Sequence, residues 1–330
     1  MKAVRLVAGL VVLVMLGTLV AQLAAPPPPA QPAGEFTSSE QCKECHAQEY
    51  EEWIGSAHAN SWNNPDVYAQ SNGFENKDCI DCHAPRPVFE TGLGNRVLPR
   101  SSRRSEGVDC ISCHMLPDGN VAGTIDNARA ACRPVTRREL QRVDYCGVCH
   151  NQHKTVDQWR KTHYAENNIG CIDCHMPHRD GDPNKGRSHV MPGGHDIDVV
   201  RSAVRWKTER AGDRIVVELE NHAGGHAFPT DERSRASDIW WRVVGTEDWN
   251  HLHRIRDPYR YETDIPRTLL GYGEVRTLEI EDAPADPVEV MWVYKLTPYY
   301  RLPETGDPIE IDEVIDPLMD SRELFRAVVE

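Results

Sequence analysis

Cysteine and histidine recur in this chain in one fixed order and spacing. The sequence of 330 residues holds eleven cysteines and fifteen histidines, and one Cys-x-x-Cys-His pattern occurs in it five times, at 42–46, 79–83, 110–114, 146–150 and 171–175. Two cysteines three residues apart lie on one face of a helical turn, with the histidine directly after them. Each copy therefore presents two thiols and one imidazole to a single shared ligand.

This pattern is typical of covalent attachment sites for c-type haem. The two thiols form thioethers with vinyl groups on one porphyrin edge, and the histidine binds the iron as proximal ligand. Structural zinc also uses paired cysteines, but zinc does not explain a histidine in the fifth place of every copy. A thioredoxin-like redox motif would occur once. The prediction is five haem c groups on Cys42, Cys45, Cys79, Cys82, Cys110, Cys113, Cys146, Cys149, Cys171 and Cys174, with His46, His83, His114, His150 and His175 as proximal ligands.

Ten further histidines are available as second axial ligands, which is more than five irons need. Met115 and Met176 directly follow a proximal histidine and cannot reach round to its iron, so bis-histidine ligation and low potentials are expected. Glycine-rich or Trp-preceded settings favour His58, His163, His189, His195 and His226 as distal ligands. His153 and His178 are reserves, and His251 and His253 are expected at the surface. Cys132 stands outside the motifs and is interpreted as an inert thiol.

Successive motifs are separated by only 20 to 32 residues. So little chain cannot enclose each porphyrin separately, so the haems are expected to pack against one another and to pass electrons between them. Stretches 37–58 and 137–150 have helical composition, and Pro and Gly interrupt the rest. Residues 37–200 are thus predicted to form a mostly α-helical and irregular multihaem domain.

The C-terminal part has a different pattern. Alternating apolar and polar residues at 204–208, 214–220, 237–245, 274–281 and 288–296 predict strands, the first two joined by a Gly-Asp turn. We expect residues 201–330 to form an antiparallel β-sandwich. This part carries −10 of the formal charge of −14, which excludes a nucleic-acid binder and favours attraction to a basic partner.

The N-terminus has the features of an export signal. Lys2 and Arg5 precede an apolar run that reaches about 20 residues, roughly the length that spans a bilayer. Residues 1–25 are therefore either a cleaved signal peptide or a retained single-pass helix, and the proline-rich residues 26–36 are a linker. We expect the body in the periplasm or on the outer face of the cytoplasmic membrane.

Three segments resemble a known family. The first motif with Tyr50, Trp53 and His58 after it, the last motif followed by Met176 and Pro177, and the stretches 188–196 and 221–230 are similar to the multihaem c-type cytochromes. That group includes the tetrahaem electron carrier partnered with hydroxylamine oxidoreductase. The resemblance implies distal ligation by His58, His189 and His226. The chain departs from it with five motifs instead of four, and with Asp231 where Gly is usual.

Two functions follow as hypotheses. We favour an electron carrier that passes single electrons along a haem chain between membrane or periplasmic redox-partner proteins. A membrane complex or a homo-oligomer is compatible with this role. The alternative is a multihaem reductase or oxidase with one open haem, acting on a small nitrogen or sulfur species. Related nitrite reductases replace a proximal histidine with lysine, and no Cys-x-x-Cys-Lys occurs here. Whether the chain is an enzyme thus depends on an open coordination position.

Overall fold

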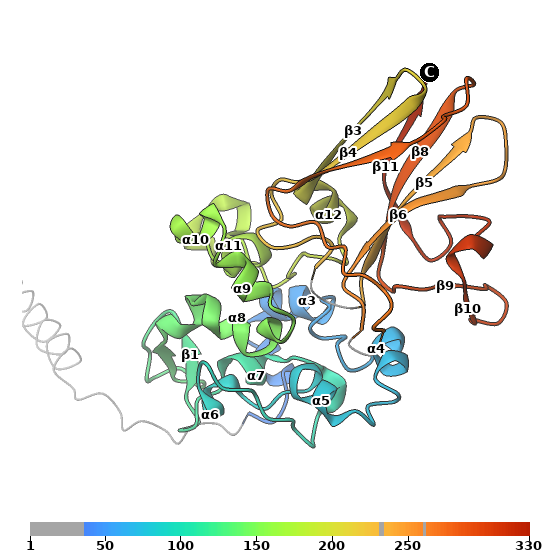
Figure 1. Ribbon diagram of the computed structural model, residues 1–330. Helices are drawn as coiled ribbons and strands as arrows, with labels where there is room; N and C mark the ends of the chain where they lie inside the picture. The colour runs from blue at the N-terminus through green and yellow to red at the C-terminus, as the bar shows by residue number, and fades with distance from the viewer. Residues whose placement is uncertain (1–35, 231–233, 260–261) are drawn as a thin grey trace, which may run out of the picture.

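The computed structural model describes residues 36–230, 234–259 and 262–330. Figure 1 shows a helical N-terminal half joined to a β-sheet C-terminal half. The predicted signal or anchor and almost all of the predicted linker lie outside the described residues. Within the described ranges, no helix has both the length and the apolar character needed to cross a bilayer.

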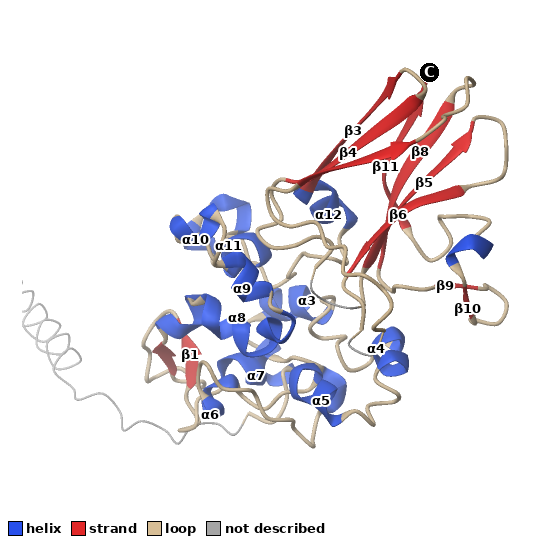
Figure 2. Ribbon diagram, viewed as in Figure 1, coloured by secondary structure: helices blue, strands red, loops and turns tan. Residues whose placement is uncertain are grey.

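Short helices joined by loops make up the N-terminal half (Figure 2). They are α2 (Glu40–Lys43), α3 (Ala47–Ile54), α4 (Pro65–Gln70), α5 (Lys77–His83), α6 (Val88–Thr91), α7 (Cys110–His114), α8 (Val143–His150), α9 (Thr155–Trp159), α10 (His163–Glu166) and α11 (Cys171–His175). A small parallel pair, β1 (Val121–Gly123) and β2 (Pro134–Thr136), lies between α7 and α8.

Local capping explains where several of these helices begin. The Asn64 side chain accepts from the backbone of residues 66 and 67 at the start of α4, and Asn76 and Asp109 cap α5 and α7. The helix expected over 37–58 is interrupted, because His46 has φ −119° and ψ 49° between α2 and α3. The longest of these helices has eight residues, so packing rather than helix propensity must hold them.

Two antiparallel sheets form the C-terminal half, after α12 (Ile197–Ala203). One sheet has the order β11-β8-β5-β6 and the other β3-β4-β7. Their strands are β3 (Val204–Ala211), β4 (Arg214–Asn221), β5 (Ala236–Val243), β6 (Asn250–Arg256), β7 (Val275–Ile280), β8 (Val288–Lys295) and β11 (Arg322–Val329). Short strands β9 (Tyr300–Arg301) and β10 (Pro308–Ile309) form a separate pair.

Both sheets contribute to one hydrophobic core. Ile215, Val217 and Leu219 of β4 lie in the same buried cluster as Ile239 of β5 and Trp292 of β8. The alternation of buried residues along β4 is the period-two pattern that the sequence predicted for a strand with one buried face. A second, smaller cluster lies around Trp240 and Tyr300.

Strands β6 and β11 were not predicted from the sequence, and the prediction that His251 and His253 lie at the surface was wrong. His251 and His253 both belong to β6, where each is partly buried. The Nε2 atom of His251 lies 3.2 Å from the Asp238 carboxylate. The stretch 250–256 is too polar to show a strand pattern, and pairing with β5 overrides that local preference.

Candidate haem-attachment sites

The five motifs lie at the ends of short helices. In α5, α7, α8 and α11 the helix ends at the histidine of its motif. In the first copy the cysteines lie at α2 and the turn after it, and His46 precedes α3. All eleven cysteines are free thiols, so both thiols of every motif remain available for thioether bonds.

Motifs distant in the sequence are neighbours in space. A hydrogen bond with the Cys110 thiol raises the pKa of Cys42, which joins the first motif to the third. Hydrogen bonds with Cys171 and with Cys82 likewise raise the pKa values of Cys146 and Cys149, respectively. These contacts place the fourth motif beside both the fifth and the second.

The third and fourth motifs complete this cluster. The Tyr145 hydroxyl next to the fourth motif donates to the carbonyl of Cys113, and the Cys113 thiol acts electrostatically on Cys146 and Cys149. Burial raises the pKa of Cys113 to about 12. The spatial order is therefore first, third, fourth and fifth, with the second motif beside the fourth, which differs from the chain order.

Three proximal histidines are held by the same kind of hydrogen bond. Nδ1 of His83 donates to the carbonyl of Ser61 at 2.9 Å, and Nδ1 of His114 donates to that of Ala122 at 2.8 Å. Nδ1 of His175 donates to the carbonyl of Pro192 at 2.6 Å. A proton fixed on Nδ1 leaves the lone pair of Nε2 free, which is how a metal-binding histidine is usually oriented.

A second imidazole lies opposite two of these rings. The His114 and His189 ring centres are 6.4 Å apart, and those of His175 and His226 are 6.5 Å apart with planes only 17° from parallel. Two metal–nitrogen bonds of about 2 Å plus the two ring radii require roughly 6 Å between the centres of trans imidazoles. The spacing therefore fits one iron between each pair.

The second imidazoles have the same Nδ1 arrangement. Nδ1 of His189 donates to the carbonyl of Arg187 at 3.1 Å, and Nδ1 of His226 donates to that of Ala227 at 2.9 Å. Burial lowers the pKa values of His114, His189 and His226. These rings are therefore neutral at pH 7, the form that binds iron.

His58 lies near His150, the histidine of the fourth motif. Its ring centre is 5.9 Å from that of His150, and the two planes are 81° apart. Its Nδ1 contacts the sulfur of Met191 instead of a carbonyl. The structure thus brings three of the five candidate distal histidines, His58, His189 and His226, close to proximal ones.

An ion pair fixes the segment that carries His189. The Glu52 carboxylate of α3 accepts from Arg179 at 2.9 and 2.8 Å and from the backbone N–H of His189 at 2.7 Å. These bonds, the one to Arg179 first, lower the pKa of Glu52 to about 2. The helix that follows the first motif therefore positions a histidine opposite the third motif.

Glycine and asparagine shape the loop that carries His226. Gly225 has φ +66°, and a Cβ on Gly224 would lie 2.6 Å from the Asn221 side chain. The fully buried Asn221 donates to the carbonyls of His226 at 2.7 Å and Leu270 at 3.0 Å. The end of β4 thereby places His226 against the haem-binding half, where the backbone N–H of Ala227 also donates to Gln158.

The other two candidates have different neighbours. His163 is bonded to the Tyr272 hydroxyl through Nδ1 and packs against Tyr164 at 4.1 Å between ring centres. Nε2 of His195 lies 3.1 Å from the Arg235 guanidinium. Among the described residues, His153, His178 and His222 each have a buried Nδ1 without a hydrogen-bond partner.

A phenylalanine that sequence reasoning missed lies near the second motif. The ring centre of Phe74 is 6.2 Å from that of His83, and Trp62 stacks on Phe74 at 3.9 Å. An isolated Phe in a polar stretch gives no sequence signal for such a place. At the second site a phenyl ring thus lies as far from the motif histidine as a second imidazole does at the third and fifth sites.

Comparison with known proteins agrees with this geometry. The family described as cytochrome c554 and c-prime matches residues 41–115, which hold the first three motifs. No curated protein gives a match. Among solved structures, a penta-heme cytochrome c552 from Thermochromatium tepidum has the same fold, with a TM-score of 0.60 at 18% identity over 89% of this chain and 98% of that one.

A superoxide reductase also aligns, with 10% identity over 39% of this chain and 87% of that one, but its TM-score of 0.21 supports no argument. The family match and the shared fold together support a multihaem c-type cytochrome. Covalently bound haem c and electron transfer belong to that class.

Proposed function

We propose that the chain is a pentahaem electron carrier that passes single electrons along a row of haems. The observation that carries this proposal is the contiguity of the five motifs, whose thiols contact one another across motifs. When bound, haem iron supplies one-electron redox chemistry. The chain supplies the thiols, the tethered proximal imidazoles and the packing that keeps successive sites adjacent.

The proposed distal ligands are His58 for the fourth site, His189 for the third and His226 for the fifth. Each has a ring near the matching proximal ring. His163 and His195 remain candidate distal ligands from the sequence, with no site assigned to either. Bis-histidine ligation keeps the potentials low compared with ligation by methionine.

Haem counting and spectroscopy of the purified holoprotein test this function. Mass and pyridine haemochrome analysis should give five haems per chain. A carrier with closed irons gives low-spin EPR signals and no optical change when carbon monoxide is added to the reduced protein. Fewer than five haems would overturn the haem count, and carbon monoxide binding by the reduced protein would overturn the closed-iron carrier.

The second candidate function, a reductase or oxidase with an open haem, is favoured by one observation. The ring of Phe74 lies as far from His83 as an imidazole lies from the motif histidine at two other sites, and a phenyl ring cannot bind iron. The second haem would then be five-coordinate and able to bind a small nitrogen or sulfur species. A high-spin signal from one haem, lost when carbon monoxide or nitrite binds, would support this function.

The partner and location remain proposals from the sequence. The charge of −10 on residues 201–330 would attract a basic redox partner in the periplasm or on the outer face of the cytoplasmic membrane. Membrane association would follow if residues 1–25 are retained, and a membrane complex or a homo-oligomer is a separate proposal. Fractionation of cells and N-terminal sequencing test retention, and the salt dependence of the electron-transfer rate tests the charge.

A further inference from the structure

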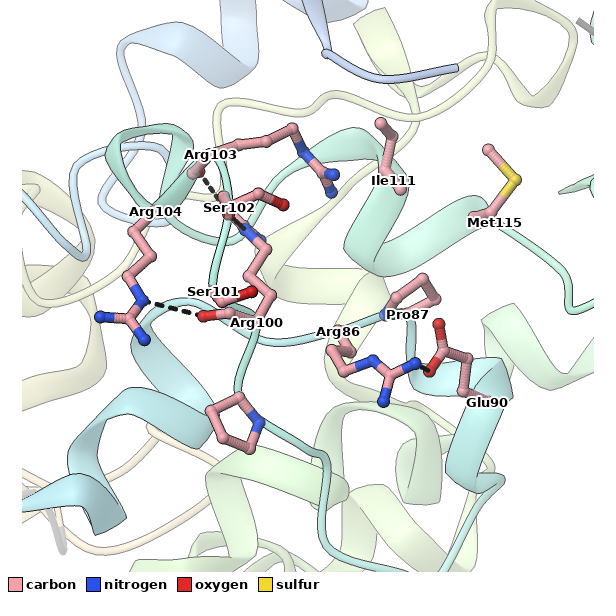
Figure 3. Close-up of a pocket in the computed structure, with 11 residues that line it drawn as sticks. Arg86, Pro87, Glu90, Arg100, Ser101, Ser102, Arg103, Arg104, Ile111 and Met115 are labelled. Carbon is pink, nitrogen blue, oxygen red and sulfur yellow. Dashed lines mark hydrogen bonds and ion pairs between the residues drawn. The ribbon is translucent and has the colours of Figure 1, made fainter. Parts of the chain in front are cut away.

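An arginine-rich cavity of about 670 Å³ lies beside the third motif. Figure 3 shows its lining, with α6 and α7 contributing alongside the segment 99–104. Four arginines, Arg86, Arg100, Arg103 and Arg104, face it against a single carboxylate, Glu90. In a chain with a formal charge of −14, this concentration of positive charge suits an anion.

The cavity adjoins the third attachment motif. Ile111 of α7 and Met115, the residue directly after this helix, both line it. Cys110 and His114 of the same helix belong to the third motif. An anion in the cavity would therefore lie next to the third haem site.

Arg100 forms part of the cavity wall, and all of its N–H donors are bonded to other groups of the protein. It is 5% exposed, and its donors reach the carbonyls of Pro85, Ser102, Arg103 and Gly107 and the hydroxyl of Ser112. These bonds fold the segment 100–107 around one guanidinium. Arg100 therefore shapes the cavity and has no donor left for a ligand.

Arg103 retains donors for a ligand. Its backbone has a left-handed φ of 46°, and its Nε donates to Asp109 at 3.1 Å. Among the described residues, its two terminal nitrogens have no hydrogen-bond partner. Figure 3 shows this guanidinium between Ser102 and Ile111, while Arg104 extends on the other side of Arg100.

We propose that this cavity binds an anion with carboxylate or oxyanion groups, and that the guanidinium of Arg103 is its main contact. A guanidinium presents parallel N–H donors that match two oxygens of such a group. The Ser101 and Ser102 hydroxyls line the same cavity and provide neutral donors. A free anion and the propionate of a neighbouring haem share this chemistry, and the experiment below separates them.

Asp109 connects this site to the third motif. Its carboxylate caps α7 by accepting from the Ser112 backbone at 2.7 Å and hydroxyl at 2.6 Å, and it also accepts from Arg103. An anion on Arg103 therefore adds negative charge close to the helix that ends at His114. This charge stabilises ferric iron and lowers the potential of that haem. The lowered haem potential rests on the proposed function, whereas anion binding by the cavity does not.

Calorimetry of the holoprotein with inorganic phosphate at constant ionic strength tests the site. We expect saturable binding at one site, weakened about tenfold or more in Arg103→Gln because a charge-assisted contact is lost. Arg129→Gln, which changes an exposed arginine, should bind phosphate as the parent does. A redox titration with and without phosphate should show one haem potential lowered by phosphate.

If the anion in the cavity is the propionate of a neighbouring haem, the same experiments give a different result. The parent then binds no phosphate, while Arg103→Gln shifts a propionate bending mode in the resonance Raman spectrum and lowers one haem potential. Equal phosphate binding by the parent and Arg103→Gln overturns the proposal. So does the absence of both phosphate binding and a Raman shift. A haem count in the same samples shows independently whether the proposed function has failed.

Discussion

The rings of His175 and His226 lie 6.5 Å apart and nearly parallel, although one ends the last motif and the other follows the second long strand of the β-sheet half. In both rings the Nδ1–H group donates a hydrogen bond to a backbone carbonyl. The fifth site is therefore built jointly by the two halves of the chain.

Replacement of His226 should open one haem. His226→Ala removes the imidazole that faces His175, so one low-spin haem should become high-spin and bind carbon monoxide when reduced. EPR and optical titration measure this change. His253→Ala, which alters a partly buried histidine of β6, should leave all signals as in the parent. An unchanged spectrum for His226→Ala would remove His226 from the set of ligands.

Loss of the Glu52 charge should loosen the third site. Its pKa is lowered from 4.5 to about 2, so its stabilising effect is present above pH 4.5 and is lost as the pH falls towards 2. The side chains of Arg179 and Glu52 are only 11% and 16% exposed, and Gln keeps an oxygen that accepts from Arg179, so Glu52→Gln should cost about 1–2 kcal/mol of unfolding free energy. Denaturant titration at pH 7 and pH 3 measures it.

The matched control for Glu52 is Glu51→Gln, because Glu51 pairs with Lys43 on the exposed surface. It should change stability by less than about 0.5 kcal/mol. A high-spin signal that appears in Glu52→Gln at neutral pH, and not in Glu51→Gln, would show that the ion pair holds His189 in place. Equal behaviour of the two variants would contradict this.

Lys295 should make the protein more stable at alkaline pH. This lysine is fully buried, with its ammonium 3.5 Å from the centre of the Tyr300 ring. Burial lowers its pKa from 10.5 to about 8, so between these values the unfolded chain binds more protons and stability rises with pH. The full effect is about 3 kcal/mol. Thermal unfolding at pH 7 and 9 should show the rise.

Lys295→Met provides the control for that pH dependence. It keeps a long apolar side chain over Tyr300 and removes the buried charge, so the rise between pH 7 and 9 should become much smaller. A variant that keeps the parent's rise would assign the pH dependence to another group.

Asp238 of β5 should be important for the stability of the sheet in which it lies. Its carboxylate is fully buried and accepts from Arg254 at 2.7 and 3.0 Å. Asp238→Ala leaves that guanidinium buried without its partner, at a cost of about 3 kcal/mol or more. Asp248→Ala on the exposed loop should cost less than about 0.5 kcal/mol. Urea unfolding of both variants tests the difference.

The attachment motifs were visible in the sequence because their chemistry depends only on local spacing. Strands β3 and β4 were visible for a similar reason, since each has a more buried face with period two. Strand β8 was visible as an apolar run, and it is buried at almost every position. The sequence also singled out the loop of His226 by its glycines, and the structure shows that Gly224 has no room for a side chain.

Other features depend on long-range packing and could not be read locally. The sequence could not place the first motif beside the third, nor Phe74 near His83. Local sequence alone also did not separate His189, which Glu52 anchors, from His163, which contacts Tyr272; only the family resemblance favoured His189. Both are polar loop or helix-end histidines until the fold brings their neighbours.

The bond from Asn221 to the loop of His226 has a consequence for biosynthesis. Residue 226 is made after all five motifs, so every haem is attachable before this imidazole has a folded strand to hold it. The fifth site would be completed last, when β4 pairs with its neighbours. Maturation would then proceed through a species with five covalent haems and one unfinished iron, and a chain that stops before β4 would remain in that state.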